Sequence, residues 1–285
     1  MNLLTLRQQY HQRICKEIIR IGEDGEKGYP NFADKDSVSS KSIAWGIVNR
    51  IECPASTQKV SGQTAGKLFE VITKDYLEQV FGILQHLRPG RWYYSTEQPI
   101  SAFDQYEHLI ELEEIVEQNS ELASALGKDY IIRPDIVVGR YAVTDNEINK
   151  HQPLIPSGQS IAQLTPLRQS NFSRPHCILH ASVSCKWTLR SDRSQNARAE
   201  ALNLIRNRKG PLPHIVAVTA EPMPTRIASL ALGTGDLDCV YHFALHEMQQ
   251  TIEELGNEDQ LDMLNMLVKG RRLRDISDLP FDLIV

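Results

Sequence analysis

Residues 177–187 read CILHASVSCKW, a run of apolar and small polar side chains that ends in a lysine and a tryptophan. The length and composition of this run predict a β-strand. Because side chains alternate between the two faces of a strand, one face should be polar and the other should pack into the core. The expected polar face carries His180, Ser182, Ser184 and Lys186, and the expected apolar face carries Leu179, Ala181, Val183 and Cys185.

Lys186 calls for a partner, since a lysine in such a strand is uncommon unless a carboxylate or an anion meets it. Asp135 is the candidate. It lies in the apolar run IIRPDIVV, within a strand predicted over residues 130–138. An isolated buried charge is too costly, so a carboxylate there is either paired or bound to a metal. The alternative, a lysine at a strand end that reaches solvent, leaves Asp135 unexplained.

Glu200 follows on a helix predicted over residues 194–208, which stops at the glycine of a Lys-Gly-Pro sequence. Its position is at the edge of the buried stripe of that helix, so it can lean toward the sheet that carries Asp135 and Lys186. Two carboxylates and a lysine can hold a divalent cation and polarise a water against a phosphodiester. Mg²⁺ is the expected ion, because it takes oxygen ligands and keeps several waters.

The sequence RSDRS, residues 190–194, has the groups that read base edges. Arg190 and Arg193 match guanine O6 and N7, and Asp192 can accept from cytosine N4. A solvated turn that caps the next helix through Asp192 or Ser194 is the alternative. Both can hold at once, but capping alone explains neither arginine. The pattern therefore predicts recognition of G·C pairs.

The net charge of -5 averages over surfaces that face different ways. Residues 186–210 hold seven basic side chains against two acidic ones, Asp192 and Glu200. Residues 101–127 hold seven acidic side chains and no lysine or arginine. We expect the basic segment to face phosphate and the acidic segment to face water.

Apolar periodicity outlines the rest of the fold. Helices are expected over residues 4–21, 38–51, 65–87, 107–126 as one helix or a pair, 194–208, 244–255 and 258–268. Strands are expected over residues 130–138, 177–187, 214–220 and 239–243. The proline-rich residues 146–175 predict an excursion from the core. Together these predict an α/β fold with a mixed central sheet flanked by helices, in a single domain of residues 1–285.

Other features disfavour several classes of protein. The first twenty residues are charged and amphipathic, so neither a signal peptide nor a membrane span is expected. Five scattered cysteines without a C-x-x-C pair predict a reduced cytoplasmic protein without structural zinc. His242 and His246 lack the H-E-x-x-H order of zinc proteases. A nucleophilic Cys185 is disfavoured, because its side chain is expected to face the core.

The chain resembles the NgoMIV family of type II restriction endonucleases, whose members read CCGG cores. The resemblance is carried by long matching stretches that cover most of the chain: SGQTAG with Phe69 and Glu70, DYIIRPDIVVG, LHASVSCKWTLRSDRSQNARAEALNLIRNRKG, LPHIVAVTAEP, ALGTGDLDCVYHFAL and RDISDLPFDL. It implies the restriction-endonuclease-like PD-(D/E)xK fold with an altered motif. Ser184 stands where the usual second acid would be, and Glu200 supplies that carboxylate from the following helix.

The resemblance also assigns roles to individual residues. By position, the active-site residues are Asp135, Ser184, Lys186, Glu200 and Glu70, and the metal ligands are Asp135, Glu200 and the backbone carbonyl of Cys185. Glu70 by itself reads only as an acid on a helix face. Readers of the central CCGG would be Arg190, Asp192 and Arg193, and readers of the outer G·C pair would be Asp34, Gln63 and Arg226. A homotetramer of two DNA-binding dimers is implied as well.

These observations predict a Mg²⁺-dependent restriction endonuclease that cuts double-stranded DNA at a palindromic GCCGGC-like site and leaves 5′ overhangs. A PD-(D/E)xK nuclease of repair or recombination that reads DNA structure is one alternative, and RSDRS disfavours it. A sequence-specific DNA-binding protein without catalysis is another, and the pairing of Asp135 with Lys186 disfavours it.

Overall fold

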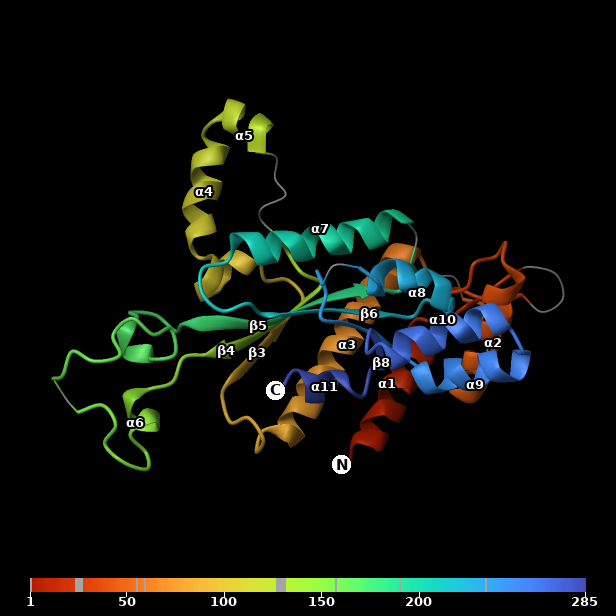
Figure 1. Ribbon diagram of the computed structural model, residues 1–285, viewed down its shortest axis with the longest axis horizontal. Helices are drawn as coiled ribbons and strands as arrows, with labels where there is room; N and C mark the ends of the chain where they lie inside the picture. Colours follow the sequence, from red (N-terminus) through yellow and green to blue (C-terminus); the bar gives the residue numbers. More distant parts are fainter. Residues whose placement is uncertain are drawn as a thin grey trace.

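A six-stranded mixed sheet forms the centre of the computed structural model, with strand order β3-β4-β5-β6-β7-β8 (Figure 1). The structure describes residues 2–23, 28–54, 56–58, 60–126, 132–156, 158–189, 191–233 and 235–285, without the side chains of 125, 126 and 191–194. The strands are β3 (Trp92–Ser95), β4 (Ile136–Tyr141), β5 (Cys177–Lys186), β6 (His214–Thr219), β7 (Cys239–His242) and β8 (Leu273–Asp275). Strands β3 to β5 pair antiparallel, and β5 to β8 pair parallel. The predicted mixed sheet is confirmed.

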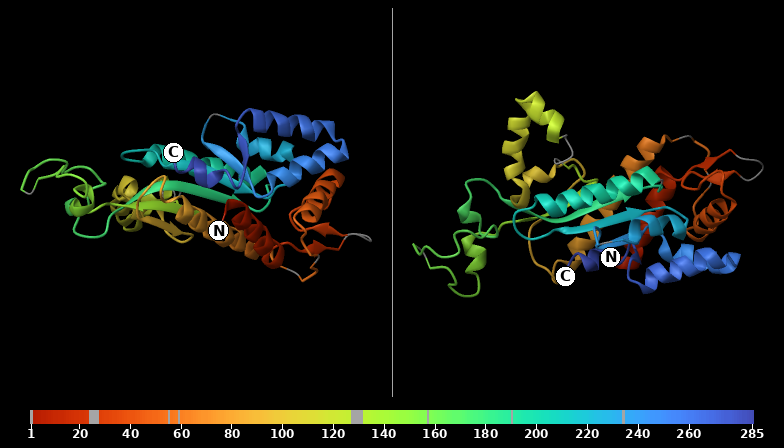
Figure 2. Two further views of the ribbon diagram at one scale, coloured as in Figure 1. Left: turned by 90° about the horizontal axis from the view of Figure 1, so that it is seen from below. Right: turned by 45° about the horizontal axis from the view of Figure 1, so that its top comes forward.

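Helices cover both faces of this sheet. The α-helices of the described residues are α1 (Leu3–Glu17), α2 (Val38–Arg50), α3 (Gly62–Leu84), α4 (His108–Glu117), α5 (Ser120–Leu126), α6 (Asp145–Ile148), α7 (Ser191–Asn207), α8 (Pro224–Ala231), α9 (Leu245–Leu255), α10 (Glu258–Lys269) and α11 (Leu279–Asp282). Figure 2 shows α7 on one side of the sheet and α1 with α3 on the other. Strands β6 and β7 are buried along nearly their whole length, which is typical of α/β folds.

Helix α3 shows how the sequence sets these elements. Ser61 caps its start by accepting a hydrogen bond from the Thr64 backbone N–H at 3.1 Å. Apolar residues then recur at helical spacing and form a continuous buried stripe: Ala65, Phe69, Ile72, Tyr76, Leu77, Val80, Phe81 and Leu84. The long helix predicted here is confirmed, with both ends shifted toward the N-terminus by three residues, from 65–87 to Gly62–Leu84.

Strand β5 contains a bulge that the sequence did not reveal. His180 has no partner on β4, because Val138 pairs with Ala181 and Gly139 pairs with Leu179. The His180 ring lies 5.1 Å from the ring of His214, which is opposite Ala181 in β6. His180 therefore lies on the face of Ala181. The prediction that it shares a face with Ser182, Ser184 and Lys186 was wrong, because it assumed an unbroken pleat.

Two other expectations about boundaries were also wrong. Residues 130 and 131 of the strand predicted over 130–138 lie outside the described residues, and β4 begins at Ile136, so Asp135 precedes it. The helix predicted over residues 194–208 begins at Ser191, so most of RSDRS belongs to its first turn and does not form a separate loop. Strands β3 and β8 and helix α8 were not predicted.

The excursion predicted over residues 146–175 is present as an arm that projects from the sheet between β4 and β5 (Figure 1). Its base is closed by Arg168, which forms a bidentate ion pair with Asp145 at 2.7 and 2.8 Å. Apolar side chains of this arm face solvent, and Leu164 is 99% exposed.

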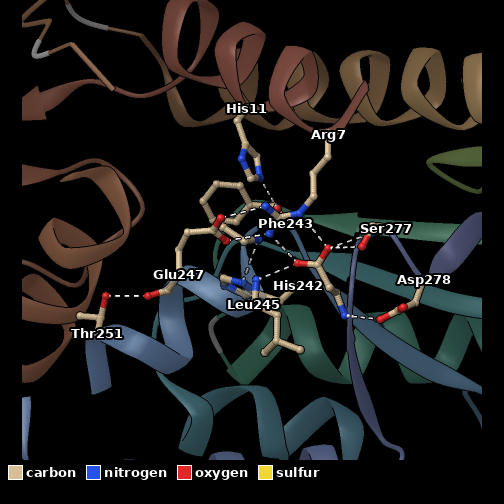
Figure 3. Close-up of polar contacts among 11 residues, drawn as sticks. Arg7, His11, His242, Phe243, Leu245, Glu247, Thr251, Ser277 and Asp278 are labelled. Carbon is tan, nitrogen blue, oxygen red and sulfur yellow. Dashed lines mark hydrogen bonds and ion pairs between the residues drawn. The ribbon is translucent and has the colours of Figure 1, made fainter. Parts of the chain in front are cut away.

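A buried charge cluster joins the two ends of the chain (Figure 3). Arg7 of α1 forms ion pairs with Glu247 of α9 at 2.7 Å and with Asp275 of β8 at 2.8 Å. Burial opposes ionisation of Asp275, yet its bonds with Arg7 lower the pKa of this carboxyl to about 2. His11 adds a contact of 2.7 Å from Nε2 to the Phe243 carbonyl oxygen.

One disulfide is present. Cys15, near the end of α1, is joined to Cys53, in the turn after α2, with the two Cα atoms 5.3 Å apart. The prediction of a fully reduced chain is wrong for this pair, because the fold brings together segments whose proximity the sequence does not show. Cys177, Cys185 and Cys239 are free. Among the described residues, no helix is long and apolar enough to span a membrane.

Candidate active site

Asp135 and Lys186 meet where β4 begins and β5 ends. The antiparallel register pairs Ile136 with Val183, which places Asp135 beside the last residues of β5. Asp135 Oδ2 lies 2.8 Å from Lys186 Nζ and accepts the Cys185 backbone N–H at 2.7 Å. The Ser184 hydroxyl lies 3.4 Å from the same oxygen. The two charged side chains are only 23% and 16% exposed, so the pair is largely desolvated.

The charges around Lys186 keep it protonated. Burial alone would lower the pKa of Lys186, but the ion pair with Asp135 and the charge of Glu200 raise it above the usual lysine value. Glu200 of α7 shows the opposite balance. Burial and the charge of Asp135 raise the pKa of Glu200, although Lys186 partly offsets this effect. Carboxylates and a lysine from three elements therefore interact at one point.

Glu70 of α3 belongs to the same site. Its pKa is raised by burial and by the charge of Asp135, against an ion pair with Lys67 at 3.1 Å. These side chains line one cavity of about 540 Å³. It is lined by Gly62, Gln63, Gly66, Lys67, Glu70, Thr96, Arg133, Pro134, Asp135, Cys185, Lys186, Trp187, Asn196 and Glu200.

Several residues of this cavity were not singled out from the sequence. Lys67 and Arg133 place two cations on its wall, and Asn196 contributes an amide from α7. Arg133 is two residues before Asp135 in the RPD sequence. This position could have identified it as a residue of the cavity. Lys67 precedes Glu70 by almost one helical turn, so the two side chains lie on the same face of α3. Once Glu70 is placed in the cavity, Lys67 is expected there too.

A second cavity of about 870 Å³ adjoins the first, since Gly62 and Trp187 line both. Arg226 of α8 and Asp34, which precedes α2, form an ion pair on its wall. Trp187 is 5% exposed and packs its ring 5.5 Å from Phe32 and 5.2 Å from Phe69. The cluster of aromatic rings thus fixes the wall between the two cavities.

The predicted base readers are distributed unevenly. Asp34 and Arg226 share the second cavity, whereas Gln63, in the first turn of α3, lines the first. Arg190 lies outside the described residues. The backbones of Asp192 and Arg193 begin α7, but their side chains also lie outside what the structure describes.

The donors in the first cavity suit Mg²⁺. No group of three or more His, Cys, Asp or Glu side chains in the described part of the chain is arranged to hold a metal ion alone. Mg²⁺ does not need such a group, because it is usually held by one or two carboxylates together with substrate phosphates and waters. Burial is the main cause that raises the pKa of Glu200, and the charge of Asp135 adds to it, so a cation near both carboxylates would relieve their repulsion.

Comparison with known proteins decides the family. The family described as NgoMIV restriction enzyme matches residues 10–285. The type II restriction enzyme NgoMIV of Neisseria gonorrhoeae is 49% identical over 284 residues, which cover 98% of this chain and 97% of that protein. The chain belongs to the NgoMIV restriction enzyme family. As a member of this family it is a type II restriction endonuclease.

A solved structure of another restriction endonuclease, the PspGI complex with substrate DNA, covers 100% of this chain and 92% of its own. The TM-score is 0.29 and the identity is 13%. Membership of the NgoMIV family rests on the sequence match over residues 10–285.

Proposed function

We propose that this NgoMIV family enzyme makes Mg²⁺-dependent double-strand cuts in DNA at a palindromic GCCGGC-like site with a CCGG core, leaving 5′ overhangs. The observation that carries the catalytic part is the ion pair of Asp135 with Lys186, which lies in a cavity that also holds Glu200 and Glu70. The target sequence follows from the resemblance and from the chemistry of RSDRS.

Asp135, Glu200 and the Cys185 carbonyl would hold the ion. When bound, Mg²⁺ supplies a polarised water and stabilises charge on the phosphoryl group and the leaving oxygen. Lys186, which is protonated and hydrogen-bonded to Asp135, stands where it can orient the attacking water and a phosphate oxygen. Ser184 orients Asp135 through its hydroxyl. Glu70, on α3, would contribute its carboxylate charge to the site.

Base reading is assigned to two groups of residues. Arg190, Asp192 and Arg193, before and within the first turn of α7, would read the central CCGG. Arg226, Asp34 and Gln63 would read the outer G·C pair. The ion pair between Asp34 and Arg226 supports this assignment, because it holds the guanidinium in a defined orientation beside the catalytic cavity.

The proposal includes a homotetramer built from two DNA-binding dimers and a cytoplasmic location, where the DNA substrate lies. It also includes a single domain over residues 1–285. One cluster of buried apolar residues that runs from Leu6 to Leu283 supports the single domain.

A cleavage assay on matched duplexes tests the target site. Purified protein is incubated with Mg²⁺ and either a GCCGGC duplex, a duplex altered in the central CCGG, or one altered only in the outer pair. We expect cleavage of the first alone, and Arg193→Ala should reduce discrimination at the centre by about tenfold or more, as loss of a bidentate base contact does. Equal cleavage of all three duplexes by the unmodified protein would refute the assignment.

A further inference from the structure

Glu221 is a buried carboxylate that the catalytic chemistry does not use. It follows β6 in the sequence TAEPMP and is 1% exposed. Its position continues the parallel pairing of β5 with β6, in which Lys186 is opposite Thr219. The Thr219 hydroxyl donates to the Lys186 carbonyl oxygen at 2.8 Å, and the Glu221 backbone N–H donates back to that hydroxyl at 3.1 Å.

The two carboxylate oxygens of Glu221 face two different segments. Oε2 accepts the Leu189 backbone N–H at 3.0 Å, directly before Arg190. Oε1 accepts the Met223 backbone N–H at 3.3 Å, at the start of α8, and lies 3.8 Å from Arg226 Nη1. Arg226 in turn pairs with Asp34. One buried side chain therefore contacts the chain that enters α7 and the arginine of α8.

We propose that Glu221 is a positioning residue that couples the two base-reading groups. It fixes the position of the Leu189 backbone relative to the guanidinium of Arg226. The inference rests on the proposed roles of Arg226 and the RSDRS segment. Its physical basis is geometric: a charged carboxylate shared by two segments fixes their separation, because each segment loses a hydrogen bond or a charge contact if it moves.

The surroundings of Glu221 make its charge sensitive to pH. Burial raises the pKa of Glu221 to about 7, although the Leu189 N–H and the charge of Arg226 oppose this shift. The charged groups that face it are Arg226 of α8 and Asp34 before α2. His242 of β7 lies near its backbone, and burial lowers the pKa of His242 to about 4, so that imidazole stays neutral over the range of interest.

The test compares Glu221→Gln with the unmodified protein. Glutamine keeps the volume and one acceptor oxygen but removes the charge that faces Arg226. The readout is the ratio of kcat/KM for a GCCGGC duplex to that for a duplex changed only in the outer pair, measured between pH 6 and pH 8. Titration of the active site affects both duplexes alike and cancels in the ratio. Glu107→Gln, an acid-to-amide change near α4, is the matched control.

We expect the unmodified protein and Glu107→Gln to lose discrimination as pH falls through about 7, as Glu221 takes up a proton. Glu221→Gln should discriminate about tenfold less at pH 8, comparable with the loss of one base contact, and should show no change with pH. Glu221→Asp, which restores the charge on a shorter side chain, should recover the pH dependence.

Arg226→Ala and Arg193→Ala separate this inference from the proposed function on which it rests. If Arg226→Ala loses discrimination at the outer pair and Arg193→Ala loses it at the central CCGG, while Glu221→Gln keeps the ratio and pH profile of the unmodified protein, the role of Glu221 is overturned and the base readers stand. If neither arginine variant changes discrimination at the base pairs assigned to it, both proposals fail. Should Glu221→Gln not fold, a constant ratio between pH 6 and pH 8 in the unmodified protein overturns the inference by itself.

Discussion

Asp135 Oδ2 accepts a hydrogen bond from the Cys185 backbone N–H at 2.7 Å while it lies 2.8 Å from Lys186 Nζ. The carboxylate is thus oriented by the main chain of β5 as well as by the lysine. Removal of the lysine side chain should leave Asp135 in place. The contribution of Lys186 to cleavage can therefore be measured separately from its contribution to the position of Asp135.

The first prediction follows from this separation. Lys186→Ala should lower the rate of Mg²⁺-dependent cleavage by at least about a hundredfold, the usual contribution of a positioned group that assists proton transfer. Specific DNA binding should persist, because the base readers are untouched. Single-turnover cleavage and a gel-shift assay measure the two quantities. Lys269→Ala, at the end of α10, is the control, and a fully active Lys186→Ala protein would refute the mechanism.

The second prediction concerns Glu200, whose pKa is raised mainly by burial. A carboxyl with a raised pKa in the folded state favours folding while it is protonated, and this contribution is lost as pH rises through the folded pKa. Glu200→Gln should therefore abolish cleavage yet raise the thermal unfolding midpoint at neutral pH. The difference in midpoint should shrink as pH falls toward the ordinary range of glutamate.

Calorimetric or fluorescence melts of the metal-free protein at several pH values check this expectation. Glu253→Gln on α9 serves as the control, since it leaves the cavity unchanged. A Glu200→Gln protein that is less stable than the parent at neutral pH would contradict this expectation. It would show that the contacts of the Glu200 carboxylate outweigh the cost of burying its charge.

Much of the fold and part of the site could be predicted from the sequence. Strands β5, β6 and β7 are apolar runs bounded by turns or helices, so their pattern is unambiguous. Asp135 and Lys186 were recognisable because each is a charge inside an apolar run, which requires a partner. Glu200 was recognisable from its place at the edge of a helical stripe.

The missed features lack such local signals. Strand β3 is half-buried along its whole length and shows no alternation, and β8 has only three residues. The bulge at His180 depends on how β4 meets β5, which no single segment encodes. Glu221 had only a weak signal, an acid that directly follows an apolar strand, and its two partners are visible only after β5, β6 and α8 are assembled.

The third prediction concerns the buried cluster that joins α1 to α9 and β8. Arg7→Met should destabilise the fold by about 3–5 kcal/mol, because it leaves the Asp275 and Glu247 carboxylates buried without a counterion. Arg13→Met is the matched control on the same helix. Its ion pairs with Asp75 and Glu17 are partly exposed, so the expected cost is only about 0–1 kcal/mol.

The effect of Arg7→Met should depend on pH with a definite sign. Since the pKa of Asp275 is lowered to about 2, its pairing stabilises the fold above the pKa of the unfolded chain and is lost as pH falls toward 2. Denaturant unfolding should thus give a difference between Arg7→Met and the parent that is largest near neutral pH and smaller in acid. A difference that grows in acid would contradict the role of this ion pair.

The fourth prediction concerns assembly. A palindromic site is read by a two-fold dimer, because each subunit presents one set of readers to one half-site. The resemblance adds a second step, in which two such dimers join. Helix α1 buries most of its apolar side chains within the fold. The arm between β4 and β5 instead exposes Leu154, Ile161 and Leu164.

We therefore expect sedimentation without DNA to show four chains and a plasmid with two sites to be cut faster than a plasmid with one. Leu164→Ser, on the arm, should weaken the tetramer and slow two-site cleavage, because it removes an exposed apolar side chain available for contact between dimers. Met266→Ser, an exposed apolar residue of α10, is the control and should leave both properties unchanged. A stable dimer that cuts one-site and two-site plasmids at equal rates would overturn the tetramer and leave the nuclease assignment intact.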